Sequence, residues 1–165
     1  MRVQCYNCGV KWHKVVDCGR LIVFMGEYRH NIDAKGRMII PARFRDELGN
    51  RFVVTRGLDG CLRTYTMAQW DAVFEQLKRL PSTKRETRMY IHMLTSKAAE
   101  CELDSQGRIL LPAALITESK IEKECVVVGV ADHVEIWAKE RWDDYYNEAS
   151  ASFEDVAEQL TEFLV

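Results

Sequence analysis

The sequence has little proline or glycine and no long hydrophobic run. Its 165 residues include three prolines and nine glycines, which excludes a collagen-like or low-complexity chain. Apolar stretches such as Cys125–Ala131 are too short to span a bilayer. Polar and charged side chains interrupt residues 1–24 as far as Leu21, so we expect no secretory signal there. We therefore expect a soluble cytoplasmic protein with no membrane partner.

The charges are unevenly distributed along the chain. The formal net charge is -2. Residues 25–97 carry 14 basic and 8 acidic side chains, whereas residues 98–165 carry 5 basic and 16 acidic ones. Such a dipolar molecule can turn one face towards phosphates despite its negative total.

The chain contains an internal repeat. Asp33–Ala42 recurs as Asp104–Ala113, with the Asp, Gly, Arg, Pro and Ala positions identical at a constant offset of 71 residues. The segments 53–57 and 125–129 then align at an offset of 72. This order and spacing indicate a tandem duplication. We divide the chain into a leader extension (1–24), repeat 1 (25–80), a connector (81–97), repeat 2 (98–150) and a C-terminal amphipathic helix (151–165).

The sequence of each repeat predicts the same series of strands and helices. A strand leads through an Asp-x-x-Gly-Arg turn into a short strand, a helix opened by proline, two more strands and a final helix. The expected strands are 27–32, 38–40, 51–56, 61–65, 99–103, 109–111, 125–130 and 134–137, and the helices are 41–48, 67–80, 112–117 and 139–150. One such unit is too small to bury a core alone. We therefore expect a mainly β, α+β fold in which both copies share one barrel-like core with interleaved hairpins.

The two Asp-x-x-Gly-Arg turns carry the candidate binding residues. Arg37 and Arg108 each follow a glycine at a hairpin tip, where an arginine can pair with guanine O6 and N7, worth about 1–3 kcal/mol. Lys35 in the first tip can contact a phosphate, whereas the second tip has Gln106 at that position.

A structural role for the same arginines stays open. Arg37 and Arg108 can instead pair with Asp33 and Asp104 to lock the turns, and the two roles can coexist. The first tip is the more basic in sequence, because Arg29, His30, Arg43 and Arg45 are its neighbours.

Enzyme chemistry has no sequence signature here. The glycines form no dinucleotide or phosphate-loop pattern. Cys61, Cys101 and Cys125 are scattered, so we expect small core residues instead of disulfides or nucleophiles. We predict a binding protein without a cofactor.

Several segments of the sequence resemble the bacterial MraZ family. The similarity covers about residues 25–160 and is strongest in 25–37, 55–62, 99–104 and 135–137. It implies a transcriptional regulator, usually a repressor, built of two AbrB-like swapped-hairpin domains with a double-psi-like barrel core. It further implies nucleoid-associated rings of many subunits. These would bind G-rich direct repeats of the form TGGGN, upstream of the division and cell-wall gene cluster that includes the regulator's own gene. Arg37, Arg108, Lys35, Arg29 and His30 are then the expected DNA-binding residues.

The first 24 residues depart from this family. Cys5, Cys8, His13 and Cys18 have the spacing of a zinc knuckle, which implies an alternative function in binding RNA or single strands. Knuckles favour glycine before the histidine, where this chain has Trp12. Family members begin near Met25, so we favour a translated upstream leader, which would form a flexible tail, over a metal site. An antitoxin-like scaffold is a third hypothesis, and the duplication argues against it.

Overall fold

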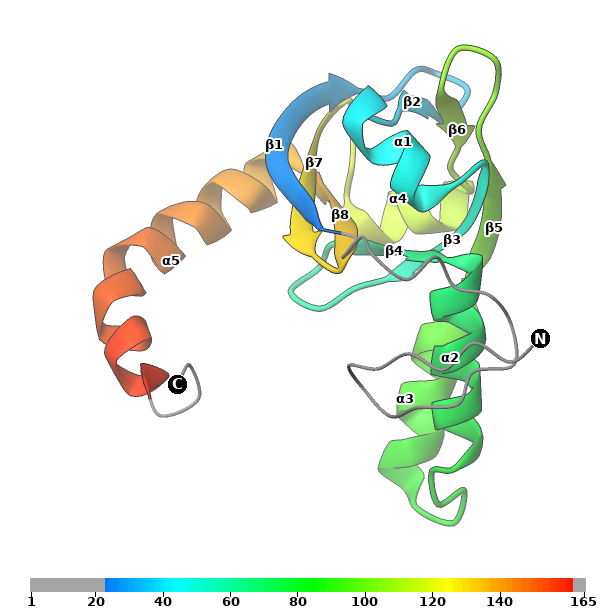
Figure 1. Ribbon diagram of the computed structural model, residues 1–165, viewed down its shortest axis with the longest axis vertical. Coiled ribbons are helices and arrows are strands. Elements are labelled where there is room, and N and C mark those ends of the chain that lie inside the picture. The colour runs from blue at the N-terminus through cyan, green and yellow to red at the C-terminus, as the bar shows by residue number, and fades with distance from the viewer. Residues whose placement is uncertain (1–22, 162–165) are drawn as a thin grey trace, which may run out of the picture.

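The computed structural model describes residues 23–161, which form eight strands and five helices (Figure 1). In chain order the elements are β1 (Phe24–Asn31), β2 (Arg37–Ile39), α1 (Ala42–Leu48), β3 (Arg51–Arg56), β4 (Leu62–Thr66), α2 (Met67–Lys78), α3 (Arg85–Thr95), β5 (Ala99–Glu102), β6 (Arg108–Leu110), α4 (Ala113–Ser119), β7 (Glu124–Ala131), β8 (His133–Ala138) and α5 (Lys139–Gln159).

Strands and hairpins from the two repeats are interleaved in one antiparallel sheet. Its order is β1-β7-β8-β4-β3-β5, and β2 and β6 form a separate two-stranded ribbon. β1 of repeat 1 pairs with β7 of repeat 2, β5 of repeat 2 pairs with β3 of repeat 1, and β4 meets β8 at the centre. Neither repeat completes a sheet without the other. The predicted α+β class and the interleaving of the two copies are confirmed.

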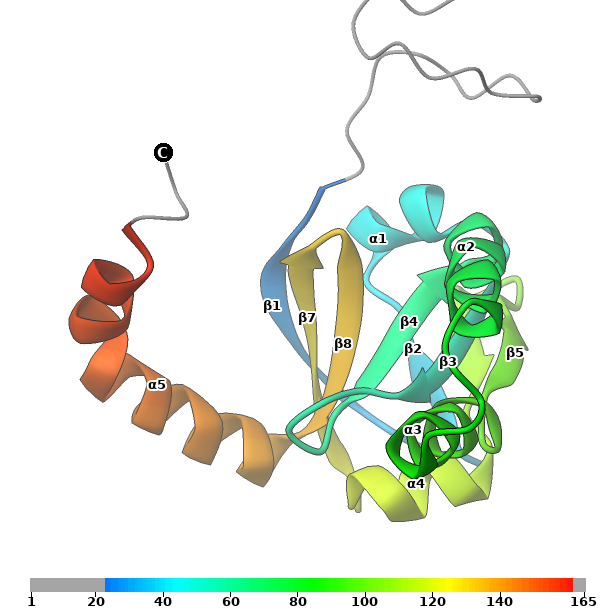
Figure 2. The ribbon, with the colours of Figure 1, turned by 90° about the horizontal axis from the view of Figure 1, so that it is seen from below.

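The larger of two hydrophobic clusters lies between the sheet and the ribbon and forms the main core. Figure 2 shows the strands of the sheet curving around this interior. Met38 and Ile109, at the middle of the ribbon, are buried in the same cluster as the sheet residues Phe52 and Val127. Phe44 of α1 also enters this cluster, as does its equivalent in repeat 2, Leu115 of α4. Cys61, Cys101 and Cys125 are free and buried, as predicted.

The short helices α1 and α4 begin one residue later than predicted. Pro41 and Pro112 occupy the N-cap positions, and the helices start at Ala42 and Ala113. Proline is compatible with this site because its fixed φ and its missing N–H do not interrupt helical hydrogen bonds. α4 also extends two residues beyond the predicted end, to Ser119.

The longer helices leave the core. α2 and α3 form a hairpin that projects from one end of the sheet, and α5 runs outward from another side (Figure 1). α5 is continuous from Lys139 to Gln159 and crosses residue 150, where the sequence suggested a boundary between two helices. At the roots of α2 and α5, Trp70 packs on Tyr65 and Trp142 on Trp137, with ring centroids 5.5 and 5.4 Å apart. These equivalent aromatic pairs anchor both helices to the sheet.

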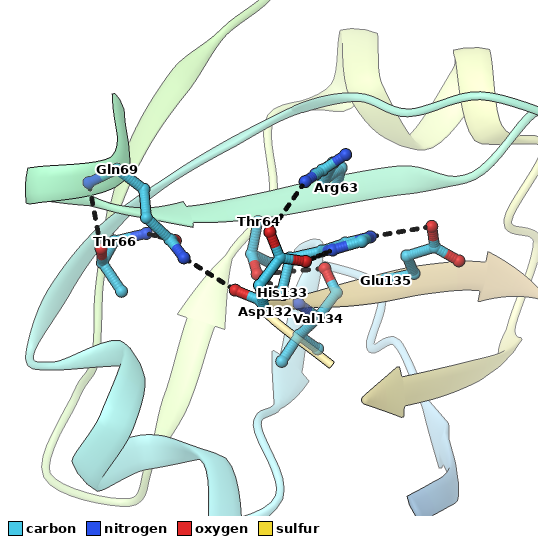
Figure 3. Close-up of polar contacts among 8 residues, drawn as sticks. All are labelled: Arg63, Thr64, Thr66, Gln69, Asp132, His133, Val134 and Glu135. Atoms are coloured by element: carbon cyan, nitrogen blue, oxygen red, sulfur yellow. Dashed lines mark hydrogen bonds and ion pairs between the residues drawn. The ribbon is translucent and has the colours of Figure 1, made fainter. Parts of the chain in front are cut away.

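Polar groups, of which Thr64 is buried, connect β4, β8 and α2 at their junction (Figure 3). The Thr64 hydroxyl donates to the Val134 carbonyl at 3.0 Å and accepts from the Val134 N–H at 3.2 Å. Gln69 of α2 donates its amide to the Asp132 carbonyl at 2.7 Å, and its Oε1 accepts from the Thr66 N–H at 2.9 Å. Because a buried polar group without a partner is costly, the Thr64 bonds favour one arrangement of the two repeats.

His133 lies between two carboxylates at the same junction (Figure 3). Its Nδ1 is 2.7 Å from Asp132 Oδ1 and its Nε2 is 3.1 Å from Glu135 Oε1. Glu135 also accepts from the Trp137 indole at 2.9 Å, and Arg63 lies 3.7 Å from Asp132. Burial lowers the pKa of His133, but the hydrogen bonds to Glu135 and Asp132 outweigh it and raise the pKa above the ordinary 6.5.

The raised pKa of His133 predicts that the stability of the fold depends on pH. A group whose pKa is raised on folding contributes fully below its unfolded value, and the contribution disappears as pH rises through the folded value. We expect the difference in the free energy of unfolding between wild type and His133→Gln to shrink as the pH is raised from about 6 through the folded-state pKa of His133. Urea unfolding followed by tryptophan fluorescence measures it. His30, whose pKa is lowered by burial and Arg45, is common to both proteins and cancels. A constant difference across this range would contradict the assignment.

Candidate nucleic-acid interface

The first Asp-x-x-Gly-Arg loop, residues 33–36, is a turn organised by one carboxylate. Asp33 Oδ1 accepts from the backbone N–H groups of Lys35 and Arg37, both at 2.9 Å. The Asp33 carbonyl accepts from the Gly36 N–H at 2.9 Å, and Gly36 has a φ of +80°. This left-handed conformation favours glycine. The hydrogen bonds inside the turn thus come from residues of the motif itself, and the Gly36 carbonyl also accepts from the Leu111 N–H of repeat 2 at 2.9 Å.

The arginine that follows each loop is tied to the aspartate that starts it. Arg37 contacts Asp33 Oδ2 through Nε and Nη2, both at 2.7 Å. In the second loop, residues 104–107, Arg108 contacts Asp104 Oδ2 at 2.8 and 2.7 Å. The turn-locking alternative is thus present in both repeats. Backbone hydrogen bonds from Arg37, then its side chain, lower the pKa of Asp33 to about 2, so the carboxylate is charged at neutral pH.

The ion pairs leave part of each guanidinium available. Arginine has five N–H donors, and the contact with aspartate uses one on Nε and one on Nη2. The side chains of Arg37 and Arg108 are 36% and 27% exposed. The Nη1 and outer Nη2 donors of both residues can therefore form a second, bidentate contact with a ligand while the loop stays locked.

β2 and β6 bring the two arginines onto one surface. In their antiparallel register Arg37 faces Leu110, Met38 faces Ile109 and Ile39 faces Arg108. Residues directly opposite one another share a face of the ribbon, and successive residues alternate between faces. Since Met38 and Ile109 point into the core, the outer surface consists of Arg37, Ile39, Arg108 and Leu110, which we call the ribbon face. A two-stranded ribbon is one of the elements that the DNA major groove admits.

Arg45 lies at the second loop, although in sequence it follows the first. A Cβ on Gly107 would clash with the Arg45 guanidinium, so this glycine makes room for the side chain. Arg45 Nε also donates to the Ile40 carbonyl at 2.8 Å. Its equivalent in repeat 2, Ile116, lies over Gly36 of the first loop, 3.2 Å from an ideal Cβ. The prediction that Arg45 adds to the charge of the first tip is wrong, because each short helix covers the other repeat's loop.

The remaining candidate residues have different surroundings. Lys35 is exposed on the first loop, and within residues 23–161 its ammonium takes part in no hydrogen bond or ion pair. Arg29 is bound to Asp143 of α5 at 3.0 Å and to Glu27 at 3.3 Å. The structure thus directs Arg29 towards α5. His30 is partly buried on β1, and its Nε2 is enclosed without a hydrogen-bond partner in the described part of the chain.

Other kinds of site find no support in the part of the chain that the structure describes. No group of three or more histidine, cysteine or acidic side chains between residues 23 and 161 is arranged to hold a metal. The proposed zinc ligands Cys5, Cys8, His13 and Cys18 lie outside those residues. Over the same range, no helix combines the length and the apolar character needed to cross a membrane.

The fold and the ribbon face define a class: a duplicated α+β protein whose interleaved repeats present paired arginine loops. A family model described as "MraZ protein, putative antitoxin-like" matches residues 23–92 and again residues 94–164. The chain belongs to the MraZ family. The two matches also agree with the tandem duplication.

Individual relatives are similar over most of this chain. A protein of Desulforamulus reducens is 54% identical over 142 residues, which are 86% of this chain and 100% of the relative. Proteins of Ligilactobacillus salivarius and Pelotomaculum thermopropionicum are each 50% identical, over 86% and 85% of this chain and 99% and 97% of their own lengths. All three are named transcriptional regulator MraZ.

Proposed function

We propose that this protein is a DNA-binding transcriptional regulator that recognises guanine-rich direct repeats through its ribbon face. The target is the upstream region of the division and cell-wall gene cluster that includes its own gene, and the expected effect is repression. The observation that carries the proposal is the ribbon face, where Arg37 and Arg108 keep unused donors on an exposed two-stranded element. The names of the relatives support the same function.

In this proposal, different side chains of the two loops contact the bases and the phosphates. Arg37 and Arg108 would pair with guanine O6 and N7, and Lys35 would contact a phosphate. Arg45 adds a second guanidinium beside Gly107, which favours phosphate contact at that end as well. Arg29 is bound to Asp143 and His30 is partly buried. Both residues would therefore support the structure around β1 and would not contact DNA directly.

Assembly into a ring in the nucleoid would multiply these weak contacts. One ribbon face per subunit supplies few bonds, whereas several faces on a ring gain affinity by effective concentration. Repeats spaced at about 10 base pairs would present the same side of the duplex to successive subunits. This arrangement accounts for DNA binding by a protein with a net charge of -2.

Fluorescence anisotropy of the full chain tests the proposal. We expect tight binding to duplex from the gene's own upstream region and at least about ten-fold weaker binding when the guanine runs are scrambled, at one fixed salt concentration. Equal binding to both duplexes would contradict sequence-specific recognition. Zinc in the purified chain together with preferred binding of single-stranded RNA would support the zinc-knuckle alternative instead.

A further inference from the structure

Two large apolar side chains lie on the ribbon face between the arginines. Ile39 is 41% exposed and Leu110 is 60% exposed, although Met38 and Ile109 beside them are fully buried. Single exposed apolar residues are common on protein surfaces. These two, however, occupy equivalent places in the two repeats, and each faces one of the arginines across the ribbon. The surface is therefore a regular alternation of cation and hydrophobe.

An alternation of this kind matches the chemistry of the major groove. Guanine presents two acceptors there, and thymine presents a carbonyl and the apolar C5-methyl group. Arginine is complementary to the first base, and an aliphatic side chain to the second. No other base edge in the major groove of unmodified DNA carries a methyl group.

We infer that Ile39 and Leu110 bind the C5-methyl groups of thymines next to the guanines that Arg37 and Arg108 contact. This inference rests on the proposed function and names the two side chains of the ribbon face that would contact a thymine beside each guanine. Side chains directly opposite on antiparallel strands have Cβ atoms about 4.5–5.5 Å apart, and stacked base pairs are about 3.4 Å apart. The methyl group therefore belongs to a base pair one or two steps from the guanine.

Association with a second copy through this face is disfavoured by charge. A symmetric contact between two ribbon faces would bring Arg37 and Arg108 of one copy against the same residues of the other. Like charges placed together at an interface suppress such pairing. DNA offers the opposite charge together with the apolar methyl groups, so it satisfies both components of the surface.

Chemical changes to the DNA test the inference with the unmodified protein. Uracil differs from thymine only by the C5-methyl group, and 5-bromouracil replaces that methyl with an atom of similar size. For wild type, we expect uracil next to the guanine runs to weaken binding about four-fold for each contacted methyl, the value of one buried CH₂. 5-Bromouracil should restore the affinity. Anisotropy titrations of the full chain at fixed salt measure all three duplexes.

A double variant assigns the effect to these side chains. In Ile39→Ala/Leu110→Ala, thymine and uracil duplexes should bind equally, whereas Leu58→Ala, which alters an exposed residue of the β3–β4 loop, should keep the thymine preference. Circular dichroism checks that the variants fold, and the wild-type comparison does not depend on them. If wild type rejects the scrambled duplex but binds thymine and uracil equally, the inference is overturned and the proposed function stands. If wild type does not distinguish the scrambled duplex, both fail.

Discussion

Replacing both ribbon-face arginines, as Arg37→Ala/Arg108→Ala, should weaken binding to the intact repeats by at least about 30-fold. Each bidentate arginine–guanine contact is worth about 1–3 kcal/mol, and the two losses combine because the residues belong to separate loops. The fold should remain, because each turn keeps the hydrogen bonds from its backbone N–H groups to Asp33 or Asp104. Anisotropy with intact and scrambled duplexes measures the change.

Two controls separate base recognition from charge. Arg37→Lys/Arg108→Lys keeps both cations but lacks the planar fork, so it should retain non-specific binding and lose the preference for intact repeats. Arg29→Ala removes an arginine that is bound to Asp143 and should preserve that preference. Wild-type affinity in the double alanine variant would show that the aspartate pairing is the whole role of these arginines.

Truncating Phe44 to alanine should lower the free energy of unfolding by about 3–5 kcal/mol, a typical cost for a buried phenylalanine. Phe44 carries α1 into the shared core, where its ring meets Phe24 at 5.6 Å and Tyr28 at 5.3 Å in edge-to-face contacts. Because this core is common to both repeats, the loss should appear in one cooperative transition. Urea unfolding provides the measurement.

Matched variants identify the cause of that loss. Phe44→Leu should lose much less, since Leu115 fills the equivalent position in repeat 2. Phe153→Ala, which truncates an exposed phenylalanine of α5, should change the free energy by no more than about 0.5 kcal/mol. A small effect of Phe44→Ala would mean that α1 is not anchored through this side chain.

The fold could be predicted from the sequence because its turns and helix starts follow from local motifs, and because those motifs occur in both repeats. The Asp-x-x-Gly-Arg turns form from neighbouring residues, and two similar small units can bury a core only by sharing it. The position of Arg45 could not be predicted from sequence distance, because the pairing of β2 with β6 carries α1 over the second loop. The sequence did show, through the offset of 71 residues, that Arg45 and Ile116 are equivalent positions of the two repeats. The predicted break between two helices at residue 150 is absent, because α5 continues from Lys139 to Gln159.

The pairing of β1 with β7 has a consequence for biosynthesis. These strands lie about 100 residues apart in the chain, a large separation of the kind that slows folding. A ribosome adding about 5–20 residues per second leaves β1 without its partner for about 5–20 s. During that interval the emerging repeat 1 can accept repeat 2 from a neighbouring chain on the same messenger. Such pairing between chains is a characteristic misassembly of repeat proteins, and it competes with closure of each chain on itself.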